Sequence, residues 1–361
     1  MTSPTGALTS ERPPPSIWWF AFGYFACYAP YAALTKALTS GLTDTGGTPV
    51  SGVELLPPSV MAAVATLFVF LIATGWWRRA GRRTIAGVTL PLPGKLTFLS
   101  GLCSSGIIAT TTLSYTFEGV SIVFVMLLMR GGVLIMAPLV DRISGRHVRW
   151  FSWAGLALSV GSLVVAFAFD PRRGGAITLV CAIDVALYLG FYFVRLSLMS
   201  KLAKSKEQGA NLRYFVEEGM VSAPVLLLLL GVGALTLGGG VGDDLRAGFT
   251  SFWDRPVALH GLAVGMLSQG TGIFGGLVFL DQRENTFCVP VNRASSVLAG
   301  LVSSAWLAWY YGSRGLPPNE LAGATLIIGA IGFLTIPSAV TKYRAGRAAA
   351  AQAATAKLSS G

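Results

Sequence analysis

The sequence predicts an all-α integral membrane protein whose ten transmembrane helices form two inverted five-helix repeats. Three observations lead to this fold class. The 361-residue chain is 53% hydrophobic and only 12% charged, which is about half the charge of a typical soluble protein. It contains ten apolar segments of roughly 20 residues, the length that crosses a bilayer. Its two halves also share a sequence pattern.

The ten apolar segments leave two short tails. We expect tails at residues 1–16 and 341–361, a first five-helix repeat over residues 17–172 and a second over residues 173–340. The predicted spans are Ile17–Ser40, Pro57–Trp77, Leu96–Thr116, Val120–Ile143, Trp150–Phe169, Ala176–Ser200, Tyr214–Leu237, Val257–Leu280, Phe287–Tyr311 and Leu321–Ala339.

The distribution of basic residues predicts that both termini lie in the cytoplasm. With this orientation, the cytoplasmic segments hold 18 of the 27 Lys and Arg residues, and the opposite loops hold five. Cytoplasmic loops of membrane proteins carry such an excess. The net charge of +11 therefore does not indicate a nucleic-acid partner.

The repeat relates predicted helices 3–5 to helices 8–10. Ser104–Glu118 aligns with Gly270–Glu284, and Arg130 then aligns with Arg293. A unit of five spans is odd, so the two halves have opposite orientations in the membrane. Inverted repeats of this kind are typical of secondary transporters, which bind substrate near the bilayer midplane between the repeats.

Arg130 and Arg293 are the first candidates for substrate binding. Arg130 lies about ten residues into its helix, or roughly 15 Å at helical rise, which is near the bilayer centre. A central Arg costs at least about 2.5–3.5 kcal/mol to insert, so it needs a partner or a function. The alternative is that each Arg forms a structural ion pair with a buried acid. The candidate acids are Glu118, Asp184, Glu217 and Glu218.

The predicted sixth helix carries Asp184, Tyr188, Tyr192 and Arg195 at spacings of four, four and three residues. This spacing places all four on one helical face. A polar face is costly against lipid, so we expect it to line the substrate pathway. The alternative is that the tyrosines pack and that Arg195 extends to the cytoplasmic edge.

Further candidates lie on predicted helices 7 to 9. Glu218 begins helix 7 inside the membrane, and we expect it, rather than Glu217, to face the cavity. Gln269 lies in a Gly-rich part of helix 8, and Asn292 precedes Arg293 in helix 9. Glu284, at a loop edge, is expected to be solvated.

Two motifs resemble those of the drug/metabolite transporter superfamily. "VNRASSVLAGL" (Val291–Leu301) is similar to the GALNK region of nucleotide-sugar transporters, with Asn292 and Arg293 at the Asn–Lys positions. A basic pair at this place is also a feature of triose-phosphate translocators. "FVEEGMVSAPVLLLLL" (Phe215–Leu230) is similar to the FYNN region, with Glu218 and Gly219 in place of the Asn pair. The resemblance implies a ten-helix transporter and a basic residue that binds an anionic substrate.

Motifs for chemistry are absent from the sequence. It contains no G-x-x-x-x-G-K-[ST] loop, H-E-x-x-H or G-x-S-x-G motif, so we expect no ATP-driven step, no enzymatic activity, no cofactor and no metal site. The four cysteines lie apart, without metal or disulfide spacing.

These observations favour a secondary transporter that moves a small polar metabolite, anionic or zwitterionic, by alternating access. The superfamily also suggests an exporter of amino acids, amines or drugs. Alternatives from other classes are a lipid-phosphate enzyme and a non-transporting membrane scaffold. The expected partners are a small-molecule substrate and membrane lipids. The sequence does not decide between a monomer and a homodimer.

Overall fold

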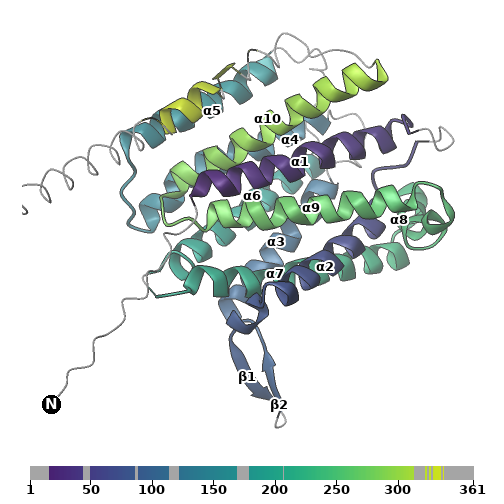
Figure 1. Ribbon diagram of the computed structural model, residues 1–361, viewed down its shortest axis with the longest axis horizontal. Helices are drawn as coiled ribbons and strands as arrows, with labels where there is room; N and C mark the ends of the chain where they lie inside the picture. Colours follow the sequence, from purple (N-terminus) through teal and green to yellow (C-terminus); the bar gives the residue numbers. More distant parts are fainter. Residues whose placement is uncertain are drawn as a thin grey trace, which may run out of the picture.

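The computed structural model describes residues 16–43, 49–85, 88–113, 122–168, 179–205, 207–312, 322, 325–326, 328–334 and 336. Long helices run side by side through the bundle (Figure 1). The α-helices are α1 (Ile17–Thr39), α2 (Leu56–Ala73), α3 (Lys95–Leu113), α4 (Ile122–Ile143), α5 (Trp150–Ala168), α6 (Leu179–Leu202), α7 (Ala210–Thr236), α8 (Gly239–Phe249), α9 (Ala258–Phe279) and α10 (Asn285–Tyr311). Two short 3₁₀ helices, η1 (Trp76–Arg79) and η3 (Ser251–Asp254), and two strands, β1 (Arg82–Ile85) and β2 (Val88–Pro91), complete the described elements.

Nine of the ten predicted segments coincide with long helices, namely α1–α7, α9 and α10. The tenth, Leu321–Ala339, is described only in part. Residues 328–334 of it are helical, and Leu334 lies so close to Gly155 of α5 that a Cβ at Gly155 would meet it at 2.7 Å. The largely helical fold is therefore confirmed, whereas the number of spans stays a prediction.

Four of the described helices are long and apolar enough to cross a membrane. They are α2, residues Cys181–Leu202 of α6, α7 and α9. Large apolar side chains also point outward from the bundle, such as Leu235, which is 86% exposed, and Leu259, which is 75% exposed. This surface suits a lipid environment, so the chain has the features of an integral membrane protein.

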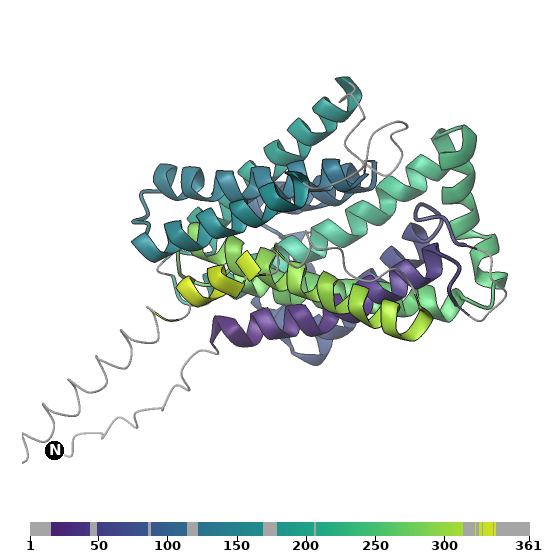
Figure 2. The ribbon, with the colours of Figure 1, turned by 90° about the horizontal axis from the view of Figure 1, so that it is seen from above.

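The helices pack in a regular set of pairs. Helix α1 packs against α9 and α10, α2 against α7 and α9, α3 against α6 and α7, and α4 against α5, α6 and α10. Figure 2 shows α10 between α1 on one side and α4 and α5 on the other. Glycines allow the closest approaches: a Cβ at Gly265 of α9 would lie 2.1 Å from the Ser59 carbonyl oxygen of α2.

Two predicted connections contain structure of their own. Strands β1 and β2 pair as antiparallel neighbours, in which Arg82 pairs with Pro91 and Ile85 with Val88. The two strands project from the bundle at the bottom of Figure 1. The Glu217 carboxylate holds the chain before β1 and after β2, because it accepts hydrogen bonds from the Gly81 amide at 2.9 Å and the Gly94 amide at 2.8 Å.

Helix α8 follows α7 in the other connection. It is short and packs against α7 and α2, with Leu245 buried. Its sequence is rich in Gly and Asp, which are poor helix formers.

Candidate functional site

The two predicted arginines lie on helices that touch, α4 and α10. The Arg130 Nη2 atom donates a hydrogen bond to the Tyr28 hydroxyl of α1 at 3.3 Å. The Arg293 Nη2 atom donates to the Tyr192 hydroxyl of α6 at 3.1 Å. Both arginines line the same small cavity, together with Ser159 of α5. The structure therefore brings the two arginines that align in the sequence to one cavity.

Two tyrosine pairs surround the arginines. Tyr24 and Tyr28 of α1 stack with their ring centroids 5.5 Å apart, and Tyr188 and Tyr192 of α6 lie 5.0 Å apart. Each pair is spaced by four residues, so its members share one helical face. We call Arg130, Arg293 and these four tyrosines the arginine–tyrosine cluster.

Sequence reasoning found Tyr188 and Tyr192 but missed Tyr24 and Tyr28. A usable signal was present. Tyr24 and Tyr188 are 164 residues apart, as are Tyr28 and Tyr192, and Arg130 and Arg293 are 163 apart. A search for identical residues separated by 163 or 164 positions finds the α1 tyrosines together with the α6 tyrosines and the two arginines.

The cluster carries positive charge that nothing described neutralises. In the described part of the chain, neither Arg130 nor Arg293 forms an ion pair with a carboxylate. Within the same residues, two buried atoms at the cavity, Nε of Arg293 and Oγ of Ser159, have no hydrogen-bond partner. Buried polar groups are normally hydrogen-bonded, so these orphaned atoms and the two guanidinium groups suit an anionic ligand.

Among the described residues, none of the acids considered as partners forms an ion pair with Arg130 or Arg293. Glu217 pairs with Arg213 at 2.9 Å, and Glu118 lies outside the described residues. Asp184 is 2% exposed, and its carboxylate oxygens have no hydrogen-bond partner among the described residues. It lies one helical turn from Tyr188, as its spacing predicts. The ion-pair alternative for Arg130 and Arg293 thus has no described partner.

Glu218 forms a buried ion pair with Arg195. The Arg195 Nε and Nη2 atoms donate to the Glu218 carboxylate at 2.6 and 3.2 Å, and Ser104 donates to the same carboxylate at 2.6 Å. The Arg195 side chain is only 14% exposed. The alternative that Arg195 extends to the cytoplasmic edge is therefore wrong, because the buried carboxylate holds it between α6 and α7.

Two predicted polar residues lie on the helices beside the cluster. Asn292 is buried on α10, and its Nδ2 atom lies against Gly275 of α9. Gln269 is half-buried on α9. Substrate contact by Asn292, Gln269, Asp184 and Glu218 stays a prediction.

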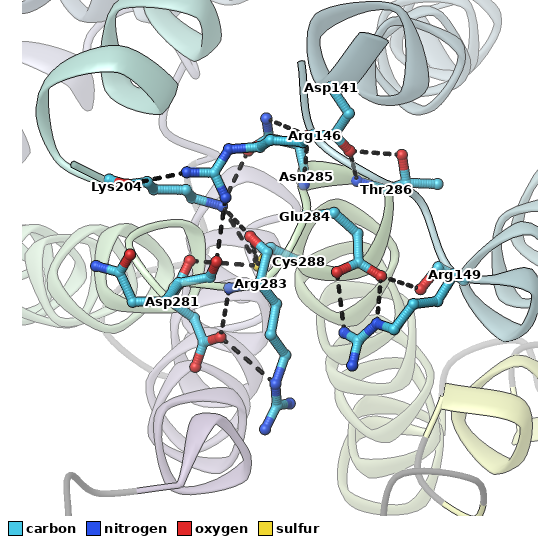
Figure 3. Close-up of polar contacts among 12 residues, drawn as sticks. Asp141, Arg146, Arg149, Lys204, Asp281, Arg283, Glu284, Asn285, Thr286 and Cys288 are labelled. Carbon is cyan, nitrogen blue, oxygen red and sulfur yellow. Dashed lines mark hydrogen bonds and ion pairs between the residues drawn. The ribbon is translucent and has the colours of Figure 1, made fainter. Parts of the chain in front are cut away.

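A polar network closes the end of the bundle where α10 begins (Figure 3). We call it the α10 network, and its centre is Asp141 at the end of α4. The Asp141 carboxylate accepts hydrogen bonds from the Asn285 amide at 2.9 Å and the Thr286 amide at 2.7 Å. It therefore caps the first turn of α10, where a negative charge is favourable. Asp141, Asn285 and Thr286 are fully buried.

Lys204, at the end of α6, joins the same network. Its Nζ atom donates to the Arg283 carbonyl at 2.7 Å and to Asn285 Oδ1 at 3.1 Å. Arg146 links the two sides by donating to the carbonyls of Gln282 and Lys204, both at 3.1 Å. Sequence reasoning counted Lys204 and Arg146 only as cytoplasmic charges, because their partners are distant in sequence.

Glu284 lies in this network and is not solvated, which corrects the expectation from its loop position. It is 6% exposed and accepts two hydrogen bonds from Arg149, at 2.8 and 2.9 Å, and one from Ser152 at 2.6 Å. Burial favours a higher pKa for Glu284, but the hydrogen bonds from Arg149 and Ser152 outweigh it and hold the pKa below its ordinary value.

Comparison with known proteins gives the fold alone. No family model matches the chain, and no curated protein matches it. One solved structure, described only as "Crystal structure of protein", superposes with a TM-score of 0.54 at 12% sequence identity. The match covers 89% of this chain and 96% of that chain. The same helix arrangement thus recurs in a protein of very different sequence.

Proposed function

We propose that this protein is a secondary transporter for a small anionic metabolite, with the arginine–tyrosine cluster as its substrate site. The observation that carries the proposal is the pair of arginines, Arg130 and Arg293, which line one small cavity and have no described carboxylate partner. Such groups bind phosphate or carboxylate through forked hydrogen bonds. The tyrosine rings and hydroxyls around them suit the rest of a small organic anion.

The helix pairs support an inverted repeat. Helices α1–α4 correspond in order to α6, α7, α9 and α10. The packed pairs α1–α9, α1–α10 and α2–α9 then correspond to α6–α3, α6–α4 and α7–α3, all of which also pack. The bonds Arg130–Tyr28 and Arg293–Tyr192 correspond in the same way. In the proposed site, each half contributes one Arg and one tyrosine pair.

Close contacts follow the same relation. A Cβ at Gly106 of α3 would meet the Phe191 ring of α6 at 2.6 Å, and one at Gly270 of α9 would meet Cys27 Sγ of α1 at 2.7 Å. Gly106 and Gly270 are 164 residues apart, as are Cys27 and Phe191, so these contacts pair the halves two residues away from the alignment of Ser104 with Gly270. Equivalent interfaces in both halves suit alternating access, in which one repeat rocks against the other.

The α10 network supports a closed state on the predicted cytoplasmic side. Its buried contacts join the start of α10 to the ends of α4 and α6 and to the start of α5. In the proposed cycle, the hydrogen bonds of this network break when the site opens to the cytoplasm. A substrate bound by both repeats stabilises the closed intermediate.

Asp184 favours a second candidate substrate, a zwitterion. Its buried, unpartnered carboxylate lies on the α6 face that also carries Tyr188 and Tyr192. A substrate with an anionic group at the arginines and an ammonium group at Asp184 would satisfy both ends of the site.

A ligand screen on the purified protein tests the proposal. Sugar phosphates, nucleotide sugars, dicarboxylates, amino acids and cationic drugs are compared by thermal shift, because a ligand that binds the folded state raises its stability. Ligands that stabilise the protein are then assayed for uptake into proteoliposomes. An anion or zwitterion should be transported by the parent protein and not by Arg293→Ala. Transport of cations alone would reject the anion site.

A further inference from the structure

A second pocket lies between α1, α9 and α10, far along these helices from the α10 network. It has a volume of about 560 Å³, within the range of small-molecule sites. Its lining is almost wholly apolar and includes Ala33, Leu34, Leu267, Val302 and Trp306. The lining residues with polar side-chain atoms are Thr43, Ser303, Trp306, Tyr311 and His260, of which His260 lies in the first turn of α9.

The pocket is separate from the arginine–tyrosine cluster. Val302 follows Arg293 by nine residues on α10, which is two and a half helical turns. The pocket and the cluster therefore lie on opposite faces of α10. Val302 and Trp306 are 49% and 43% exposed, so the pocket reaches the outer surface of the bundle, where lipid surrounds a membrane protein.

Aromatic residues place the pocket at a membrane interface. Trp306 stacks on Tyr310 with centroids 5.3 Å apart, and the neighbouring Trp309 is 81% exposed. Trp and Tyr gather where the hydrocarbon core meets the headgroups. His260, which also lines the pocket, lies at the start of α9, while Tyr311 ends α10. The pocket thus extends from the interface toward the hydrocarbon core.

Besides the shape and lining of the pocket, His260 also indicates a ligand. Its Nδ1 atom is buried and has no hydrogen-bond partner in the described part of the chain. A buried polar atom without a partner is costly, and the apolar lining offers few groups to satisfy it. A ligand that fits must therefore be apolar along most of its length and carry a hydrogen-bonding group at one end.

We infer that this pocket binds a single-chain amphiphile from the membrane, such as a long-chain fatty acid. Its chain lies among α1, α9 and α10, and its polar end forms a hydrogen bond with the imidazole of His260, which lines the pocket. This site is independent of the proposed transport function, because it shares no residue with the arginine–tyrosine cluster.

Photolabelling with a diazirine-bearing palmitic acid tests the inference on the full-length protein in detergent micelles. Labelled residues are mapped by mass spectrometry. Labelling should concentrate on the pocket residues of α1, α9 and α10 and fall when unlabelled palmitic acid competes. Uniform labelling of all outward-facing helices that unlabelled palmitic acid does not reduce would overturn the inference.

Two variants and one control make the test more specific. Val302→Trp fills the pocket from its rim and should abolish the saturable labelling, whereas Val69→Trp, at a 66% exposed position of α2, should leave it unchanged. His260→Phe removes the polar contact and should weaken competition by palmitic acid about two- to tenfold, as expected for one hydrogen bond. Unchanged competition in His260→Phe would reject His260 as the polar contact. Saturable labelling that persists in folded Val302→Trp would reject the pocket.

Discussion

The guanidinium group of Arg293 on α10 donates a hydrogen bond to the Tyr192 hydroxyl on α6 over 3.1 Å. It also lies over the Tyr192 ring, 5.6 Å from the centroid. A hydroxyl and a ring face hold the guanidinium group without neutralising it. Arg293 is therefore held in place while its charge has no carboxylate partner among the described residues, and the Arg130 guanidinium group donates in the same way to the Tyr28 hydroxyl.

Arg293→Lys should keep the charge but lose the forked contact. Losing one charge-assisted hydrogen bond costs about 1.5–3 kcal/mol, which is roughly ten- to a hundredfold in affinity. Arg293→Ala should nearly abolish uptake of the anion found in the screen. If folded Arg293→Ala binds and transports at the parental level, Arg293 has a structural role and an amine or apolar substrate becomes the first choice.

Tyr28→Phe and Tyr192→Phe should weaken substrate affinity to a similar extent, about two- to tenfold for one hydrogen bond each. Their hydroxyls accept equivalent hydrogen bonds from Arg130 and Arg293, so removing either leaves one guanidinium group less well oriented. Tyr310→Phe, at a 60% exposed position, is the matched control. Substrate titration by thermal shift measures the effect, and a loss confined to one half of the chain would contradict the symmetric site.

Asp141→Asn should loosen the α10 network. The carboxylate caps α10 and also accepts hydrogen bonds from the Asn285 and Thr286 side chains, and an amide cannot accept all of these. Buried Cys288, 3.7 Å from the Lys204 Nζ atom, should react faster with a maleimide in a variant that lacks the other three cysteines. Asp243→Asn on α8, outside this network, should leave the rate unchanged. An unchanged rate in Asp141→Asn would show that the network is not a gate.

Glu284 should make the stability of the protein pH-dependent. Its pKa is lowered in the folded state, so its contribution is present above the unfolded pKa of about 4.3 and is lost as pH falls through the folded value. The melting temperature of the parent protein should therefore fall on acidification below about pH 4, and Glu284→Gln should show a smaller fall. Equal pH profiles would mean that Arg149 and Ser152 do not stabilise the ionised carboxylate.

Cysteines introduced at Gly145 and Gly315 test the inverted topology. The predicted orientation places position 145 in the cytoplasm and position 315 on the opposite side, because an odd number of spans separates them. An impermeant maleimide applied to oriented membranes should label only one of the two from each side. Labelling of both positions from the same side would reject the inverted repeat.

The sequence by itself determined the helices and the candidate arginines. Long apolar runs specify α-helices in a membrane, because unpaired backbone groups are too costly there, and the cost of a central charge singles out Arg130 and Arg293. The spacing of Asp184, Tyr188 and Tyr192 also placed them on one face. These features depend on local composition and on a period of 3.6 residues, which a single sequence contains.

Only the tertiary structure decided which partner each polar side chain has. Arg195 could reach the membrane edge or a buried acid, and the packing of α6 beside α7 selected Glu218. Glu284 could be solvated, but the start of α5 brings Arg149 to it from 135 positions away. Hydrogen bonds and ion pairs act over about 3–4 Å, so they depend on which helices touch. That choice is made by side-chain packing across the whole bundle, which no local pattern encodes.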